Sequence, residues 1–161
     1  MSEAAATSPD VSSVLAALQA LYHNPDAQAK QQANQALLQF QKTPQAWSTA
    51  NALLLAQDVP LESRLFSAQT FRSKVTFDLE QLEGASQEQL RDTLLHALDM
   101  YATGPRVIQT QLCLALAALA LQMSEARWGN VVPGMILYLI HIAAPTIHAQ
   151  LSWGVYGWFR K

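Results

Sequence analysis

The chain has 161 residues, of which half are apolar and only 14% carry a charge. It is too apolar for a disordered protein and long enough for one domain with a hydrophobic core. The net charge of −2, without a visible basic stripe, gives no reason to expect nucleic acid as a partner. Cys113 is the single cysteine, so an internal disulfide is impossible and a reducing compartment is favoured.

The first half of the sequence predicts four helices in a row. Residues 11–22 carry apolar side chains at helical spacing, after a polar start at residues 1–10 that we expect to be disordered. Proline suits the first turn of a helix, because its missing N–H has no partner there. Three such starts follow, at Asn24-Pro25, Thr43-Pro44 and Val59-Pro60, with Asn24 and Thr43 as predicted cap residues.

Two further helices are predicted in the next stretch. Gly84 breaks the fourth helix near Leu79, and Ser86 followed by Gln89 resembles a capping box for a helix over 87–101. Gly104 and Pro105 then suit a helix end and a new start. The sixth helix, residues 106–123, is apolar on nearly every side over 112–121, which predicts burial between layers.

Short helices joined by short connections lie antiparallel to their neighbours, so these six form about three pairs. The prolines at 25, 60 and 105 are 35 and 45 residues apart, which is typical of irregular HEAT- or armadillo-type repeats. We therefore predict an all-α, HEAT-like solenoid. Solenoids work by offering a surface to another protein, so binding is expected rather than catalysis.

The sequence changes character near its end. No Asp, Glu, Lys or Arg occurs from Gly129 through Phe159, and residues 135–159 are long enough to span a membrane. Pro145 and several polar side chains in the middle argue against a span, so a tail-anchored membrane protein is kept as an alternative. The expected organisation is a repeat domain over 11–132 followed by an atypical apolar tail over 133–161.

Three segments together resemble the N-terminal domain of the importin-β family. They are Ala29-x-Gln31-Gln32-Ala33-Asn34-x-x-Leu37-x-x-Phe40, Pro44-x-Ala46-Trp47, and Arg64-Leu65-Phe66-x-Ala68-x-x-Phe71-Arg72-x-Lys74. The resemblance covers about residues 11–132 and is similar in particular to the transportin-SR branch, which includes the fungal messenger-RNA transport regulator.

The resemblance implies a nuclear import receptor that moves between nucleus and cytoplasm. Its N-terminal repeats would bind the GTP-bound small GTPase Ran through the inner helix of each pair, here residues 25–41, 60–79 and 105–123. It places Gln69, Arg72, Ser73 and Lys74 as partner-binding residues. Such receptors are several times longer, so we expect a truncated or aberrantly spliced form that does not bind cargo alone. The competing hypothesis is a helical-repeat scaffold without a GTPase partner, in which Arg72 and Lys74 are merely solvated.

No pattern of enzyme chemistry stands out. The sequence contains no phosphate-binding G-x-x-x-x-G-K-[ST] loop, no H-E-x-x-H and no G-x-S-x-G. The four histidines are scattered, and Cys113 lies inside an apolar run where we expect it to be core. We therefore expect no enzyme activity, no cofactor and no metal.

Overall fold

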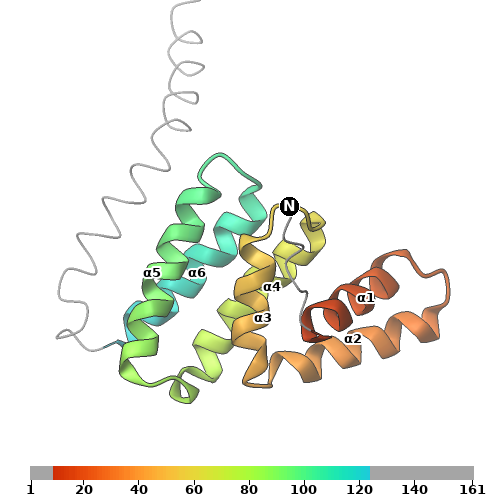
Figure 1. The fold of residues 1–161 in the computed structure, drawn as a ribbon, viewed down its shortest axis with the longest axis horizontal. Coiled ribbons are helices and arrows are strands. Elements are labelled where there is room, and N and C mark those ends of the chain that lie inside the picture. The colour runs from red at the N-terminus through yellow and green to blue at the C-terminus, as the bar shows by residue number, and fades with distance from the viewer. Residues whose placement is uncertain (1–8, 124–161) are drawn as a thin grey trace, which may run out of the picture. The chain divides into compact units, whose positions relative to one another are not determined.

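The computed structural model describes residues 9–123, and the regular secondary structure of this part of the chain is all helical (Figure 1). Its elements are α1 (Pro9–His23), α2 (Ala27–Gln41), α3 (Gln45–Leu55), α4 (Leu61–Phe77), the short 3-10 helix η1 (Leu79–Gln81), α5 (Gly84–Met100) and α6 (Arg106–Gln122). The predicted all-α solenoid of three helix pairs is confirmed. The predicted tail, residues 133–161, lies outside the described residues.

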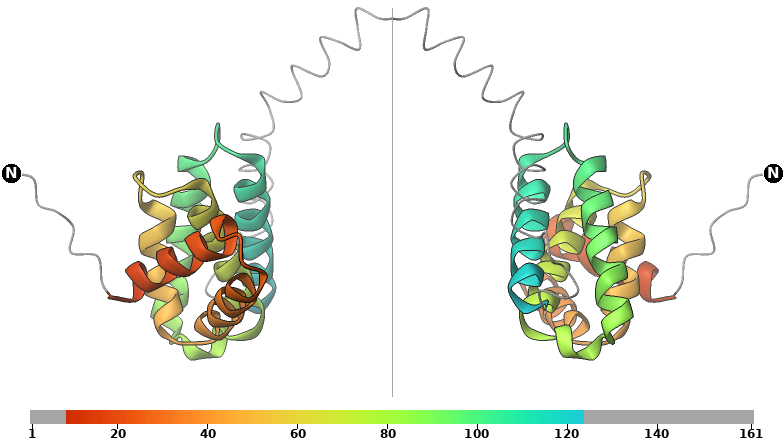
Figure 2. Two further views of the ribbon diagram at one scale, coloured as in Figure 1. Left: turned by 90° about the vertical axis from the view of Figure 1, so that its right-hand side faces the viewer. Right: turned by 90° about the vertical axis from the view of Figure 1, so that its left-hand side faces the viewer.

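By its contacts, the chain as far as Leu119 forms one compact unit, which holds α1 to α5 with most of α6. Within it, α1 packs on α2 and α3 packs on α4. Figures 1 and 2 show α3 and α5 in one layer and α4 and α6 in the other. Helices α4 and α6, which correspond to two of the predicted inner helices, therefore lie on the same side of this unit.

An apolar cluster holds the first two pairs together. Val14 and Leu18 on α1 meet Leu37 on α2, Leu53 on α3 and Phe66 on α4. Burying a side chain of this size contributes about 1.5–3 kcal/mol. Because the cluster draws on four helices, it fixes the first pair against the second.

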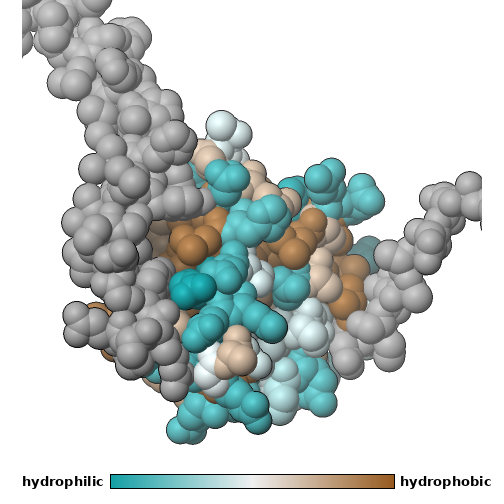
Figure 3. Space-filling view, turned by 60° about the vertical axis from the view of Figure 1, so that its left-hand side comes forward, coloured by the Kyte–Doolittle hydropathy of each residue, from teal (hydrophilic) through white to brown (hydrophobic). Residues whose placement is uncertain are grey.

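Helix α6 is buried on one side only, so the prediction of burial all round is wrong. Ile108, Leu112 and Leu116 are fully buried, whereas Val107 is 52% and Leu114 42% exposed. Within residues 9–123 no further helix follows α6 to cover its other side. Figure 3, which views the side that carries α5 and α6, shows apolar patches between polar ones.

The start of α2 corrects a predicted cap. The helix begins at Ala27, and the Asp26 carboxylate accepts hydrogen bonds from the backbone N–H groups of Gln28 and Ala29. Asn24 instead accepts from the Asp26 N–H at 2.9 Å. Asp26 is the residue next to the helix, so its oxygens reach the free N–H groups that Asn24 cannot.

The predicted cap at Thr43 is also wrong. The Thr43 hydroxyl donates backwards to the Phe40 carbonyl at 2.8 Å, and no side chain caps α3. The residue at its start is Pro44, whose backbone already has helical angles.

The connection before α5 differs from prediction as well. Helix α4 ends at Phe77, two residues before Leu79, and α5 begins at Gly84 itself, with no side-chain cap at Glu83. Ser86 lies inside α5, so it cannot form the predicted capping box. The Gln87 amide instead donates to the Leu82 carbonyl at 2.9 Å, which holds the connection against the helix.

Gly104 ends the α5–α6 connection for a different reason from the one predicted. No described glycine has a positive φ, so the left-handed conformation is not what requires it. A Cβ at this position would lie 3.2 Å from both the ring and the carbonyl oxygen of Tyr101. A larger residue at this position would require Tyr101 to shift by a few tenths of an ångström. None of the helices between residues 9 and 123 is long and apolar enough to cross a membrane.

Replacing Asp26 tests the observed cap. We expect Asp26→Ala to lower the free energy of unfolding by about 1 kcal/mol, because two N–H groups of α2 lose their acceptor. Urea unfolding followed by circular dichroism measures the change. Asp58→Ala removes the same charge from an exposed loop and is the control. Equal effects of the two substitutions would contradict the cap.

Candidate protein-binding surface on the inner helices

An open groove lies between α4 and α6 on the layer predicted to face a partner. It has a volume of about 340 Å³ and is lined by Gln69, Arg72, Ser73, Thr76, Phe77 and Gln111. Three of the four residues predicted from the sequence therefore line one hollow. We call it the α4–α6 groove.

Arg72 carries the charge of the α4–α6 groove. Its side chain is exposed, and one guanidinium nitrogen donates to the Gln111 side-chain oxygen at 3.2 Å, which joins α4 to α6. Gln111 is neutral, and no carboxylate of residues 9–123 lies within ion-pair distance of Arg72. The groove thus presents a positive charge whose position is fixed by a neutral neighbour.

The other residues that line the α4–α6 groove are partly polar and partly aromatic. Gln69 is exposed and Ser73 half-buried, and both can donate and accept hydrogen bonds. Phe77, at the end of α4, is 77% exposed. A large aromatic side chain next to a fixed cation is a combination enriched at protein interfaces.

Three lining residues were not predicted. Thr76 and Phe77 lie one turn beyond Ser73 on α4, so helical spacing alone could have added them. Gln111 comes from another helix, and its place in the groove depends on how α6 packs, which the sequence does not display.

Lys74 does not belong to this surface. Its side chain is only 1% exposed, so the prediction that it lies on an exposed helix surface is wrong. The ammonium donates to the backbone carbonyls of Gln41 and Thr43, at 3.4 and 3.0 Å. It also donates to the side-chain oxygens of Asp78 and Gln81, both at 3.1 Å.

The surroundings of the ammonium explain why it can be buried. A charge taken out of water is costly unless its donors are all satisfied and an opposite charge lies close. Here Asp78 supplies the opposite charge, and the Trp47 ring lies with its centroid 5.0 Å from the nitrogen, within cation–π range. Lys74 therefore joins the α2–α3 turn, the start of α3 and η1 at one point.

Trp47 packs against Phe71 of α4. Its ring centroid lies 6.3 Å from that of Phe71, in a tilted arrangement. The indole N–H donates to the Gln81 side-chain oxygen at 3.3 Å, the same atom that accepts from Lys74. Trp47 is thus part of the surroundings of Lys74.

Similarity to known proteins agrees with this arrangement of helices. Residues 33–99 match the family described as the Importin-beta N-terminal domain. The chain is 40% identical over 114 residues to Transportin MOS14 of Arabidopsis thaliana, and 41% identical over 125 residues to the mRNA transport regulator MTR10 of Saccharomyces cerevisiae. Human Importin-13 is 33% identical over 126 residues.

The chain carries an importin-β N-terminal domain of the transportin branch. The alignments cover 71%, 76% and 78% of this chain but only 12%, 12% and 13% of the three relatives. The chain thus spans about an eighth of the length of the relatives it matches.

Cys113 lies on α6 of this domain and is half-buried. Burial raises the pKa of its thiol, because it disfavours the charged thiolate. A higher pKa means less of the reactive thiolate at neutral pH, which is unfavourable for a nucleophile.

Substituting Lys74 tests its role in the importin-β N-terminal domain. We expect Lys74→Met to lower the free energy of unfolding by about 3 kcal/mol, because Asp78 and two carbonyl groups lose a buried partner. Arg72→Met, on the same helix but exposed, is the matched control and should change stability little. Similar midpoints in urea for both variants would exclude the proposed role.

Alkylation tests the state of Cys113. We expect iodoacetamide at about pH 8 to modify the folded domain more slowly than free cysteine, because the raised pKa leaves less thiolate. Denaturing urea should remove the difference. A folded-state rate equal to that of free cysteine would be inconsistent with this burial.

Proposed function

We propose that the chain is the N-terminal part of a nuclear import receptor and binds the GTP-bound form of Ran through its inner helices. The α4–α6 groove, with Arg72 at its centre, is the contact that carries this proposal. Membership in the importin-β family supports the kind of partner. No bond is made or broken in this role, since recognition alone is required.

The positive charge of Arg72 supports a protein partner that places an acidic side chain in the groove. Arg72 is held by the neutral Gln111 and has no carboxylate neighbour among residues 9–123. An acidic side chain of the partner would accept from the guanidinium in a charge-assisted hydrogen bond. Phe77 beside it offers apolar area that such a contact can cover.

Dependence on the nucleotide follows from the behaviour of small GTPases. Their switch segments are ordered by the γ-phosphate and released on hydrolysis. A rigid groove that contacts those segments would therefore bind one nucleotide state in preference. In the cell, such a domain would follow its GTPase between nucleus and cytoplasm.

Binding of Ran to the purified chain tests the proposal. We expect Ran loaded with a non-hydrolysable GTP analogue to bind in calorimetry, and Ran loaded with GDP not to bind. Arg72→Glu should weaken the complex by about tenfold or more, because it places like charges in contact. Gln69→Ala and Ser73→Ala should have smaller effects, since each removes only neutral hydrogen bonds.

The control is Arg91→Glu, which makes the same charge reversal on α5, in the other layer. It should leave binding unchanged, and circular dichroism should show both variants folded. Equal binding of the two nucleotide states, or of the Arg72 and Arg91 variants, would favour a scaffold without a GTPase partner.

A further inference from the structure

The α4–α6 groove holds two side chains that orient each other. A guanidinium nitrogen of Arg72 donates to the Gln111 side-chain oxygen at 3.2 Å, from one helix to the other. A guanidinium has donors and no acceptor, so Gln111 must present its oxygen to it, which fixes the orientation of the amide. In a primary amide, one N–H lies on the same edge as the oxygen. This N–H donor of Gln111 therefore lies beside the guanidinium.

The backbone that carries Gln111 is fixed by its neighbours on α6. Ile108 and Leu112, each within one turn of Gln111, are fully buried. The Gln109 side-chain amide donates to the Tyr101 carbonyl at 2.6 Å, which bonds the start of α6 to the end of α5. The side chain that meets the guanidinium thus projects from an immobilised turn of helix.

Both side chains of the pair keep donors for a ligand. The Gln111 amide nitrogen and the other guanidinium nitrogens of Arg72 have no hydrogen-bond partner among residues 9–123. A carboxylate has two oxygens and accepts from two neighbouring donors at once. Its hydrogen bond with the guanidinium is charge-assisted, which makes a carboxylate the preferred ligand over a neutral carbonyl group.

The neutrality of Gln111 matters as much as its oxygen. A glutamate at this position would form an ion pair with Arg72 and cancel the positive charge of the groove. Glutamine holds the guanidinium without neutralising it. An acidic side chain of a partner therefore meets a cation that is already in place, so less side-chain freedom is lost on binding.

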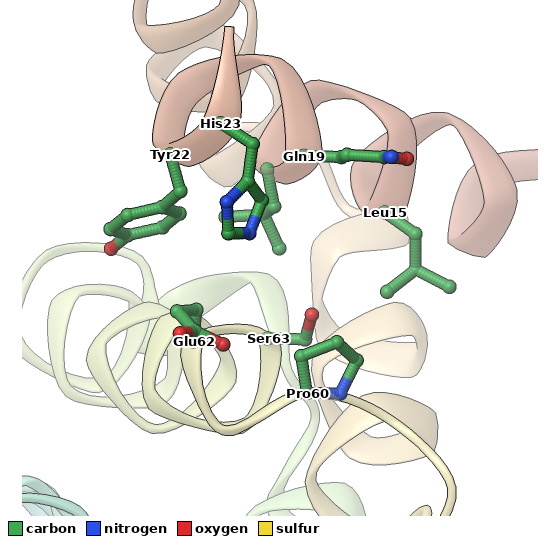
Figure 4. A pocket seen from close by; sticks show the side chains of 8 residues that line it. Leu15, Gln19, Tyr22, His23, Pro60, Glu62 and Ser63 are labelled. Atoms are coloured by element: carbon green, nitrogen blue, oxygen red, sulfur yellow. The ribbon is translucent and has the colours of Figure 1, made fainter.

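Another hollow, between α1 and the first turn of α4, has the opposite character. It has a volume of about 360 Å³, and Figure 4 shows Glu62 and Ser63 facing Tyr22 and His23 across it. The Glu62 carboxylate would repel a second carboxylate. None of the side chains labelled there has a buried polar atom without a partner. A carboxylate ligand therefore favours the α4–α6 groove.

We propose that Arg72 and Gln111 donate together to one carboxylate of the partner, and that Gln111 makes the groove selective for an acidic side chain. The inference rests on the proposed function, in which the partner is GTP-bound Ran. An aspartate or glutamate of the GTPase accepts from the guanidinium with one oxygen and from the Gln111 amide with the other. Gln111 both positions Arg72 and contacts the partner itself.

Calorimetric titration of the full chain with Ran carrying a non-hydrolysable GTP analogue tests this pair. Gln111→Glu should weaken the complex by about tenfold or more, because the new carboxylate pairs with Arg72 and repels that of the partner. Gln111→Met should weaken it by a few-fold, and by less in an Arg72→Met background, because the two donors act together.

The control is Gln89→Glu, which introduces the same charge at an exposed position of α5, in the other layer. It should bind Ran as the unsubstituted chain does, and circular dichroism should show all variants folded. If Gln111→Glu and Gln89→Glu bind Ran equally well, the role of Gln111 is refuted while the Ran proposal stands.

A second titration tests the carboxylate site without Ran. The side-chain amide signals of Gln111 in the nitrogen-15-labelled chain are assigned by their absence from Gln111→Met. The probe is acetyl-glutamate N-methylamide at millimolar concentration, and acetyl-glutamine N-methylamide is its neutral counterpart. We expect only the glutamate probe to shift these signals, and Arg72→Met to abolish the shift.

The two titrations separate the two proposals. A shift specific to the glutamate probe, in a chain that does not bind Ran, would support the carboxylate site and reject Ran as its partner. Equal shifts from the two probes, or none from either, would overturn the shared carboxylate site whether or not Ran binds.

Discussion

The domain depends on one buried ammonium group. Lys74 is surrounded by oxygen atoms from two connections of the chain and by an aromatic ring, and nothing in an apolar core could replace it without leaving those oxygens unsatisfied. A long, flexible cation can satisfy acceptors that come from different directions, which a neutral side chain of similar size cannot. The arrangement of the second helix pair against the first therefore rests on electrostatics as much as on packing.

Helix α4 carries a row of buried polar side chains on one side and the exposed side chains of the α4–α6 groove on the other. Ser63, Ser67, Thr70 and Lys74 are all nearly inaccessible and follow each other at helical spacing. The Gln41 side chain at the end of α2 donates to the Thr70 hydroxyl at 2.9 Å. Thr70 and Lys74 have hydrogen-bond partners on this inward side, whereas the Ser67 hydroxyl has none, and Arg72 lies on the exposed side of α4.

The helices and their pairing were predictable because prolines, short connections and apolar spacing all point to antiparallel pairs. The wrong cap assignments share one physical cause, which is that several nearby residues can cap the same helix start. Asn24, Thr43 and Ser86 all fit cap patterns, but Asp26 lies nearer to its helix start, and α5 begins before Ser86. Lys74 was predicted to be a partner-binding residue from the family resemblance, although it is buried. Only the fold reveals that Gln41, Thr43, Asp78 and Gln81 converge on it. Gln111 was beyond reach for the same reason, since its distance from Arg72 is set by tertiary packing.

Tyr101 has a mechanical consequence. Its buried hydroxyl donates to the Leu54 carbonyl at 2.7 Å, so the end of α5 is bonded to the end of α3. Lys74 makes the equivalent connection at the opposite end of α3, through Thr43. Stacked helix pairs bend elastically by small rotations of one pair against the next. Because α3 is held by hydrogen bonds near both of its ends, it cannot rotate freely against its neighbours. This part of the solenoid is therefore stiff.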